Sequence, residues 1–205
     1  HGQYQLHHGR ERRQAGAGRR LIHGADRKND GSSASLSGGT YKKIEWGKSY
    51  VPANEYLADG YGYKTSDGTW EDGTASVDDV TVTPVPIKST KVYPNSETDY
   101  SGSTFDAKDS TSVTLTVSVT SDESAGLTYT WYRSINDGWR SLTNSFITQG
   151  LTEKYTGANS QTLSITELPA GQTFSYKVQI ATGDGYKCYS EPFTVTRHQH
   201  SWTYS

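Results

Sequence analysis

The sequence predicts an all-β protein whose main part is an antiparallel β-sandwich over residues 84–197. Five segments of that part alternate apolar side chains with threonine, serine and other polar ones, which is the pattern of strands that bury one face. These segments are 113–120, 127–132, 162–166, 174–180 and 193–196. Turn-forming residues separate them, and no segment has the apolar period of about 3.6 residues that marks an amphipathic helix. We therefore expect almost no helix.

The inward-facing positions of these segments supply the expected core. Every second side chain of a strand points to the same face, so the apolar members of each run should meet between two sheets. The positions that we assign to this structural core are Val117, Trp131, Leu163, Ile165, Phe174, Tyr176 and Val178.

The sequence pattern of residues 33–83 predicts a second, smaller β-rich repeat unit built of hairpins. Three Asp-Gly pairs begin at Asp59, Asp67 and Asp72, and such pairs are strong signals for tight turns. A unit of about 50 residues has a marginal core of its own, so we expect it to pack on a neighbour. The run 82–87 contains two prolines and is expected to be a stiff linker to the first edge strand of the sandwich.

Residues 1–32 have a different composition from the rest of the chain. The first 30 residues hold seven lysines and arginines against three acidic residues. Few of them are aliphatic, and such a segment buries too little apolar surface to offset the entropy lost on ordering. We expect a disordered or foreign basic tail, with a polyanion-binding arm as the alternative.

Two runs in the sandwich region are similar to parts of an immunoglobulin-type domain. The run 127–133 resembles the C strand, with Trp131 as the core tryptophan, and the run 163–178 resembles strands E and F with their corner. The region thereby resembles a bacterial immunoglobulin-like, or fibronectin-type-III-like, domain. The resemblance implies an antiparallel immunoglobulin-like β-sandwich.

The same comparison shows departures from antibody domains. Val117 and Tyr176 stand at the positions of the two cysteines that join the sheets, and Phe174 stands at the position of the corner tyrosine. The inter-sheet disulfide is therefore absent, and an antibody-type domain is disfavoured.

The flanks resemble large repetitive surface proteins of Gram-positive bacteria. The similarity lies in the Asp-Gly-Tyr and Gly-Thr-Trp motifs within 58–82 and in the terminal run 198–205. In that resemblance, residues 198–205 are the start of a truncated following repeat. It implies an extracellular or cell-surface location and a module that is monomeric by itself.

The residues disfavour an enzyme. All six histidines lie within 1–23 or at positions 198 and 200, so the folded part has none for a Ser-His-Asp, Cys-His or zinc site. The carboxylates, Glu153 among them, occur among turn residues and polar faces, and we expect them to be solvated. The single cysteine, Cys188, is expected to pack in the last strand. We therefore expect no catalytic residue.

No cofactor, metal, nucleic acid or membrane is expected as a partner. The Asp-Gly pairs lack the pattern of an EF-hand, and His198 and His200 are too few ligands for a metal site. The net charge of −2 disfavours nucleic-acid binding. No run approaches the roughly 20 apolar residues that a membrane span needs.

Aromatic residues near turns are the most suggestive feature for binding. The candidate ligand-binding residues are Tyr61, Tyr63, Trp70, Trp139 and Arg140, with Trp139 expected at a loop tip beside Arg140. Rings beside polar groups commonly bind sugars or proteins, so glycans or host and cell-surface proteins are the expected partners. Two functions follow: a structural and adhesive module of a surface protein, or a carbohydrate-binding module of a larger secreted glycan-active enzyme.

Overall fold

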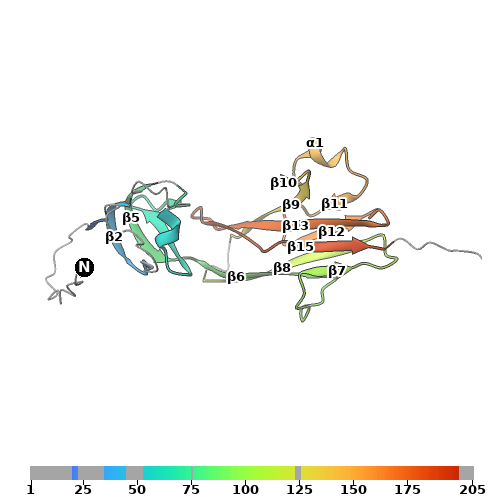
Figure 1. The fold of residues 1–205 in the computed structure, drawn as a ribbon, viewed down its shortest axis with the longest axis horizontal. Coiled ribbons are helices and arrows are strands. Elements are labelled where there is room, and N and C mark those ends of the chain that lie inside the picture. The colour runs from blue at the N-terminus through green and yellow to red at the C-terminus, as the bar shows by residue number, and fades with distance from the viewer. Residues whose placement is uncertain (1–19, 23–34, 45–52, 75, 123–125, 199–205) are drawn as a thin grey trace, which may run out of the picture.

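The computed structural model describes residues 20–22, 35–44, 53–74, 76–122 and 126–198, and this part of the chain is all-β (Figure 1). It holds fifteen strands, a single α-helical turn, α1 (Ser145–Thr148), and a short 3-10 turn, η1 (Ala53–Tyr56). The predicted fold class is confirmed. The tail expected over 1–32 and the following repeat expected over 198–205 lie almost wholly outside the described residues.

The smaller unit is a five-stranded sheet in the order β1-β2-β5-β3-β4. Its strands are β1 (Arg20–Ile22), β2 (Gly39–Ile44), β3 (Tyr61–Thr65), β4 (Trp70–Glu71) and β5 (Val77–Pro84). Neighbouring strands are antiparallel except for β1 and β2. One face of the sheet packs around the buried side chains of Tyr41, Tyr63 and Val80, which gives this unit a core of its own.

The link between the two units is shorter than the sequence suggests. Strand β5 continues to Pro84 and β6 (Ile87–Pro94) begins at Ile87, so only Val85 and Pro86 lie between them. The Val85 amide donates to the Gly60 carbonyl of the small unit at 2.8 Å, and the Pro86 carbonyl accepts from the Asp122 amide of the sandwich at 2.9 Å. The expected linker over 82–87 is therefore mostly strand. The two residues outside the strands, Val85 and Pro86, are hydrogen-bonded to the small unit and to the sandwich respectively.

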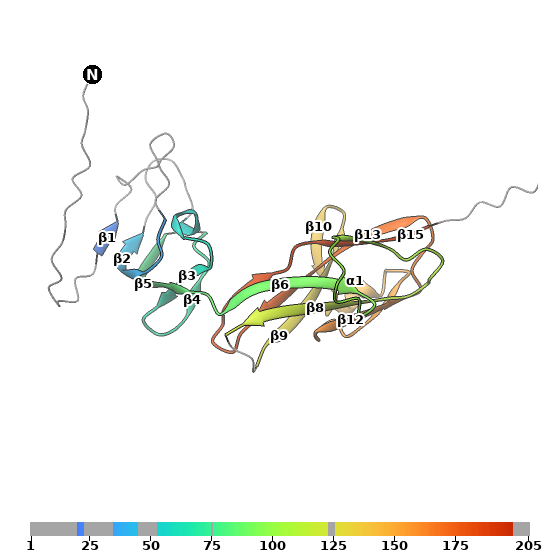
Figure 2. The ribbon, with the colours of Figure 1, turned by 90° about the horizontal axis from the view of Figure 1, so that it is seen from below.

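The larger unit packs two sheets face to face. The four-stranded sheet has the order β11-β12-β8-β6, and the six-stranded sheet has the order β10-β9-β13-β15-β7, with β14 also paired to β13. The remaining strands are β7 (Thr104–Asp106), β8 (Val113–Ser121), β9 (Thr128–Ile135), β10 (Gly138–Ser141), β11 (Lys154–Thr156), β12 (Thr162–Thr166), β13 (Gln172–Ala181), β14 (Lys187–Tyr189) and β15 (Phe193–Arg197). Figures 1 and 2 show the small unit at one end of this sandwich.

The strand order is that of an immunoglobulin fold. With β11, β12, β8 and β6 taken as strands D, E, B and A, and β10, β9, β13 and β15 as C′, C, F and G, the two sheets read D-E-B-A and C′-C-F-G, and β7 pairs with β15 beyond G. All pairs are antiparallel except β7 and β15, which run parallel along the edge.

The core lies between the sheets and contains all seven positions assigned to it from the sequence. Phe174 is the most exposed of them, at 5%. The Trp131 indole donates to the Ser160 carbonyl at 2.9 Å, so its polar edge is satisfied inside the sandwich. Val117 and Tyr176, at the positions of the missing cysteines, are fully buried. Packing therefore fills the place of the disulfide.

The sequence reading missed the shortest strands. Strands β7, β10 and β11 span three or four residues each, which is too short for alternation to stand out. The prediction that Cys188 lies in the last strand is wrong, because it belongs to β14 and β15 follows. Within the described ranges, no helix has the length and apolar character to span a bilayer.

Candidate functional site

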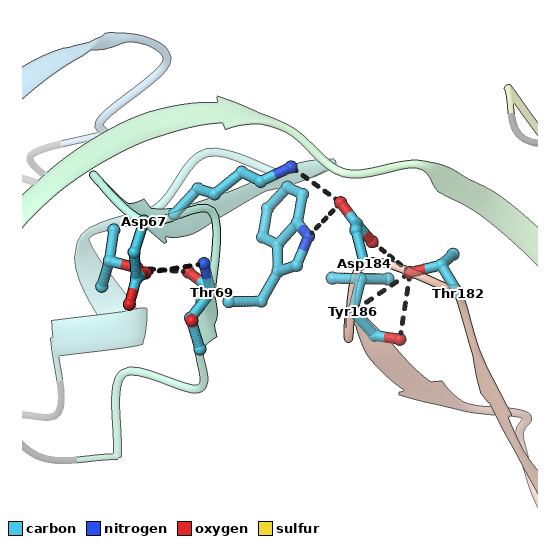
Figure 3. A network of polar contacts seen from close by, with 8 residues as sticks. Asp67, Thr69, Thr182, Asp184 and Tyr186 are labelled. Atoms are coloured by element: carbon cyan, nitrogen blue, oxygen red, sulfur yellow. Dashed lines mark hydrogen bonds and ion pairs between the residues drawn. The ribbon is translucent and has the colours of Figure 1, made fainter.

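A carboxylate of the sandwich contacts the small unit directly. Asp184 lies in the turn between β13 and β14, and its Oδ2 accepts hydrogen bonds from Lys64 Nζ at 2.7 Å and Trp70 Nε1 at 2.8 Å (Figure 3). The Trp70 ring meets Tyr186 edge to face at 5.0 Å, and the Lys64 ammonium lies 5.0 Å from the Trp70 ring. We call this set, Lys64, Trp70, Asp184 and Tyr186, the junction cluster.

The hairpin between β13 and β14 holds Asp184 in place through contacts within the sandwich itself. The Thr182 hydroxyl donates to the other carboxylate oxygen of Asp184 and accepts from the Tyr186 amide at 3.0 Å (Figure 3). Burial alone would raise the pKa of Asp184, but hydrogen bonds from Lys64, Thr182 and Trp70 outweigh it and hold that pKa far below its usual value. The carboxylate is therefore ionised at neutral pH.

The hairpin of the small unit positions the two donors. The Asp67 carboxylate accepts from the Thr65 hydroxyl and from the Thr69 amide at 3.1 Å, which closes the turn between β3 and β4. A Cβ at Gly62 would lie 2.9 Å from the Trp70 ring and 3.0 Å from a methyl group of Val85. Glycine at position 62 therefore lets the tryptophan lie against the strand and reach Asp184.

A cleft of about 500 Å³ opens beside the junction cluster. Tyr61, Trp70 and Tyr186 supply its rings, and Glu71, Asp72 and Lys187 supply its charges. Two of the predicted ligand-binding residues, Tyr61 and Trp70, line this cleft.

Tyr63 is not a surface residue, although the sequence places it with the binding aromatics. It is fully buried in the core of the small unit, and its hydroxyl donates to the Ala53 carbonyl at 2.6 Å. Burial raises its pKa well above the usual value. Tyr61 and Tyr63 both belong to β3, but Tyr61, at the first position of the strand, is only partly buried against this core and also lines the cleft.

A second group of rings lies on the outer face of the six-stranded sheet. The Lys177 ammonium is 4.6 Å from the centre of the Trp139 ring and 4.4 Å from that of Tyr189. Tyr132 meets Tyr189 edge to face at 6.0 Å. We call these four residues, Tyr132, Trp139, Lys177 and Tyr189, the ring–lysine surface.

Strand register brings the ring–lysine surface together. Lys177 of β13 pairs with Tyr132 of β9, and Trp139 of β10 pairs with Ser134, two residues along β9 from Tyr132. Tyr189 of β14 pairs with Gln179, whose amide donates to its hydroxyl. Side chains two residues apart share a face, so all four members project outward.

Trp139 and Arg140 do not form one site. The structure places both in β10, not at a loop tip, and consecutive strand residues point to opposite faces. Arg140 pairs with Arg133, whose side chain turns toward the core, and is itself exposed. The turn at Asn136 and Asp137 is so tight that the strand begins directly after it.

Glu153 corrects the expectation that the carboxylates are solvated. Its side chain is 2% exposed, forms an ion pair with Arg133 and accepts from the Tyr155 hydroxyl at 2.6 Å. The Arg133 guanidinium also lies 4.4 Å from the Phe174 ring. Burial raises the pKa of Tyr155 strongly, so this hydroxyl stays a donor to Glu153. The group has the character of a structural ion pair, in which Glu153 is paired with Arg133 and bonded to Tyr155 while the buried Arg133 Nε has no hydrogen-bond partner among the described residues.

The described residues hold no group of three or more His, Cys, Asp and Glu side chains that suits a metal ion. Cys188 packs against the sandwich core, and burial raises the pKa of its thiol to about 11. A thiol with that pKa is a poor nucleophile at neutral pH.

No protein-family model matches the chain, and no curated protein matches its sequence. The function must therefore be inferred from its residues and their arrangement.

Proposed function

We propose that the chain is a non-catalytic structural and adhesive module of a modular bacterial surface protein, in which the junction cluster fixes one unit on the next. The observation that supports this most is the double hydrogen bond from Lys64 and Trp70 to Asp184. The extracellular setting rests on the resemblance of the flanking motifs to Gram-positive surface proteins.

A spacer needs a joint that resists bending, and this joint is restrained in two ways. The two-residue link is bonded to Gly60 on one side and to Asp122 on the other. The junction cluster then ties the hairpin at Asp184 to β3 and β4, about 120 residues earlier in the chain. Because the two restraints lie at different points, bending at the link has to break the cluster.

The test measures the distance between spin labels in the two units. Labels at Lys42→Cys and Ser118→Cys, in a Cys188→Ser background, place one probe on an exposed strand position of each unit. We expect a single narrow distance distribution for the parent and a broad one for Asp184→Ala. Asp99→Ala, an equally sized change at an exposed loop residue, serves as the control. A distribution that is broad in the parent protein contradicts the spacer function.

A second candidate, the carbohydrate-binding module, is favoured by one observation: the ring–lysine surface around Trp139. Sugars stack their C–H faces on such rings, and their hydroxyls bond to the polar groups beside them. A glycan array probed with the parent chain and with Trp139→Ala tests it. Binding that the substitution removes supports this candidate, and silence across the array removes it.

A further inference from the structure

We infer that the ring–lysine surface binds acidic saccharides, carboxylated or sulfated, with Lys177 contacting the anionic group. This inference deepens the carbohydrate-binding candidate and rests on it. The surface combines three rings on one sheet face with a cation among them, and each part suits one feature of such a ligand.

The rings suit the apolar face of a sugar. Among the described residues, Tyr189 is the one large apolar side chain that is exposed, at 50%. It lies beside Tyr132 and shares the Lys177 ammonium with Trp139. Aromatic side chains with exposed edges and few rotatable bonds lose little entropy on binding, which favours contact with the C–H face of a pyranose ring.

The charge of the surface favours an anion. No carboxylate in the described part of the chain forms an ion pair with Lys177, whose charge contacts are the two rings alone. The strand positions next to it on the same face are Ser175, Gln179 and Thr130, which carry hydroxyl and amide groups. An ammonium with free donors, set among neutral hydrogen-bonding groups, complements a ligand that has one negative charge per several hydroxyls.

The same features disfavour a nucleic acid. Nucleic-acid binding sites neutralise several phosphates with many cations, whereas this surface centres on a single lysine. The cleft at the junction is a weaker candidate for the saccharide, because the Trp70 indole and the Lys64 ammonium are already bonded to Asp184.

Titration calorimetry on the full chain tests the inference with three tetrasaccharides. The probes are tetragalacturonate, its fully methyl-esterified form, and a sulfated carrageenan tetrasaccharide. We expect the two acidic probes, or one of them, to bind and the neutral ester to bind at least tenfold more weakly. Comparison of the two acids tells a carboxylate ligand from a sulfate ligand.

Substitutions locate the site. Lys177→Gln should raise the Kd of the acidic probe about tenfold, since a hydrogen bond to a charged group is lost. Lys91→Gln makes the same charge change on an exposed strand of the other sheet and should leave the Kd unchanged. Tyr189→Ala removes an exposed ring without touching the core and should weaken binding about fivefold. Thermal melts of each variant confirm that it is folded.

Three results would overturn the inference in different ways. Equal binding of the acid and its ester refutes the acidic class but leaves the carbohydrate-binding candidate intact. Acid binding that neither Lys177→Gln nor Tyr189→Ala weakens refutes the site. Absence of binding to every saccharide refutes both the inference and the carbohydrate-binding candidate, while the spacer function, tested by the label distances, is unaffected.

Discussion

Trp70 and Trp139 are alike in sequence context but differ in what the fold does with them. Each follows a tight turn and has a lysine ammonium about one ring width away, at 5.0 Å from Trp70 and 4.6 Å from Trp139. Lys64 is paired with Asp184, which also accepts from Trp70, so cation and indole are both engaged. Among the described residues, no carboxylate forms an ion pair with Lys177. One acidic residue from a distant turn thus distinguishes Trp70, whose indole is bonded to Asp184, from Trp139, which we propose as a ligand contact.

The largest expected effect comes from replacing each tryptophan by alanine and comparing the two variants. Trp70→Ala should broaden the label-distance distribution and destabilise the small unit by about 2 kcal/mol, because ring packing and an indole hydrogen bond are lost. Trp139→Ala should leave both properties unchanged and remove glycan binding. The label distances, urea unfolding and the glycan array measure the two variants side by side. If both variants gave the same profile, the two tryptophans would have one role.

A smaller change sharpens the role of Gly62. Gly62→Ala should displace Trp70, because the added methyl would lie 2.9 Å from its ring. We expect a broadened distance distribution and a loss of about 1 kcal/mol in the stability of the small unit. Gly183→Ala is the matched control, since no atom lies within 4 Å of a Cβ there. An unchanged distribution for Gly62→Ala would mean that the tryptophan does not need the close approach.

The ion pair itself is expected to contribute less. Lys64 and Asp184 are 31% and 28% exposed, so Asp184→Asn should cost about 1 kcal/mol, since the amide oxygen still accepts from Trp70. The pKa of Asp184 is lowered on folding, so its contribution to stability is complete above the unfolded-state value of about 4, declines as pH falls below it, and is fully lost only below the much lower native-state pKa. The native carboxylate stays ionised at pH 2.5, so label distances at pH 7, 5 and 2.5 should agree, while the free energy of unfolding falls between pH 5 and pH 2.5. Broadening already at pH 5 would contradict a stabilised carboxylate.

The smallest effect concerns Cys188 of β14, which lies in sequence between Tyr186 of the junction cluster and Tyr189 of the ring–lysine surface. Its pKa of about 11 predicts slow reaction with a disulfide reagent at pH 8 in the native protein and fast reaction in urea. Trp70→Ala should speed the native reaction, since Tyr186 loses its ring partner, whereas Trp139→Ala should not. A stopped-flow or absorbance assay of thiol release measures this difference. Equal rates in both variants would contradict the expectation that loss of Trp70 exposes Cys188 through Tyr186.

Alternation along the strands predicted the sandwich and its core because burial of one sheet face is a local pattern. Val117, Trp131 and Val178 could be assigned from their own neighbours in sequence. The candidate sites could not be separated in this way, since the partner of Trp70 is Asp184, more than 100 residues away. No local signal marks Glu153 as buried either, because its cation comes from Arg133 in the opposite sheet. The aromatic candidates could therefore be predicted from the sequence, but which of them are bonded to other side chains of the fold could not.

The parallel pairing of β7 with β15 has a mechanical consequence. The chain enters the sandwich at Ile87, beside the small unit, and leaves it through β15 at the far end (Figure 1). Tension between these ends pulls β7 and β15 in opposite directions along their common axis. Their backbone bonds, such as Thr194 amide to Ser103 carbonyl and Ala107 amide to Thr196 carbonyl, both 2.8 Å, then carry the load together as a shear joint. Because these bonds must break together, the sandwich is expected to resist tension along its long axis better than it would if the bonds opened one at a time.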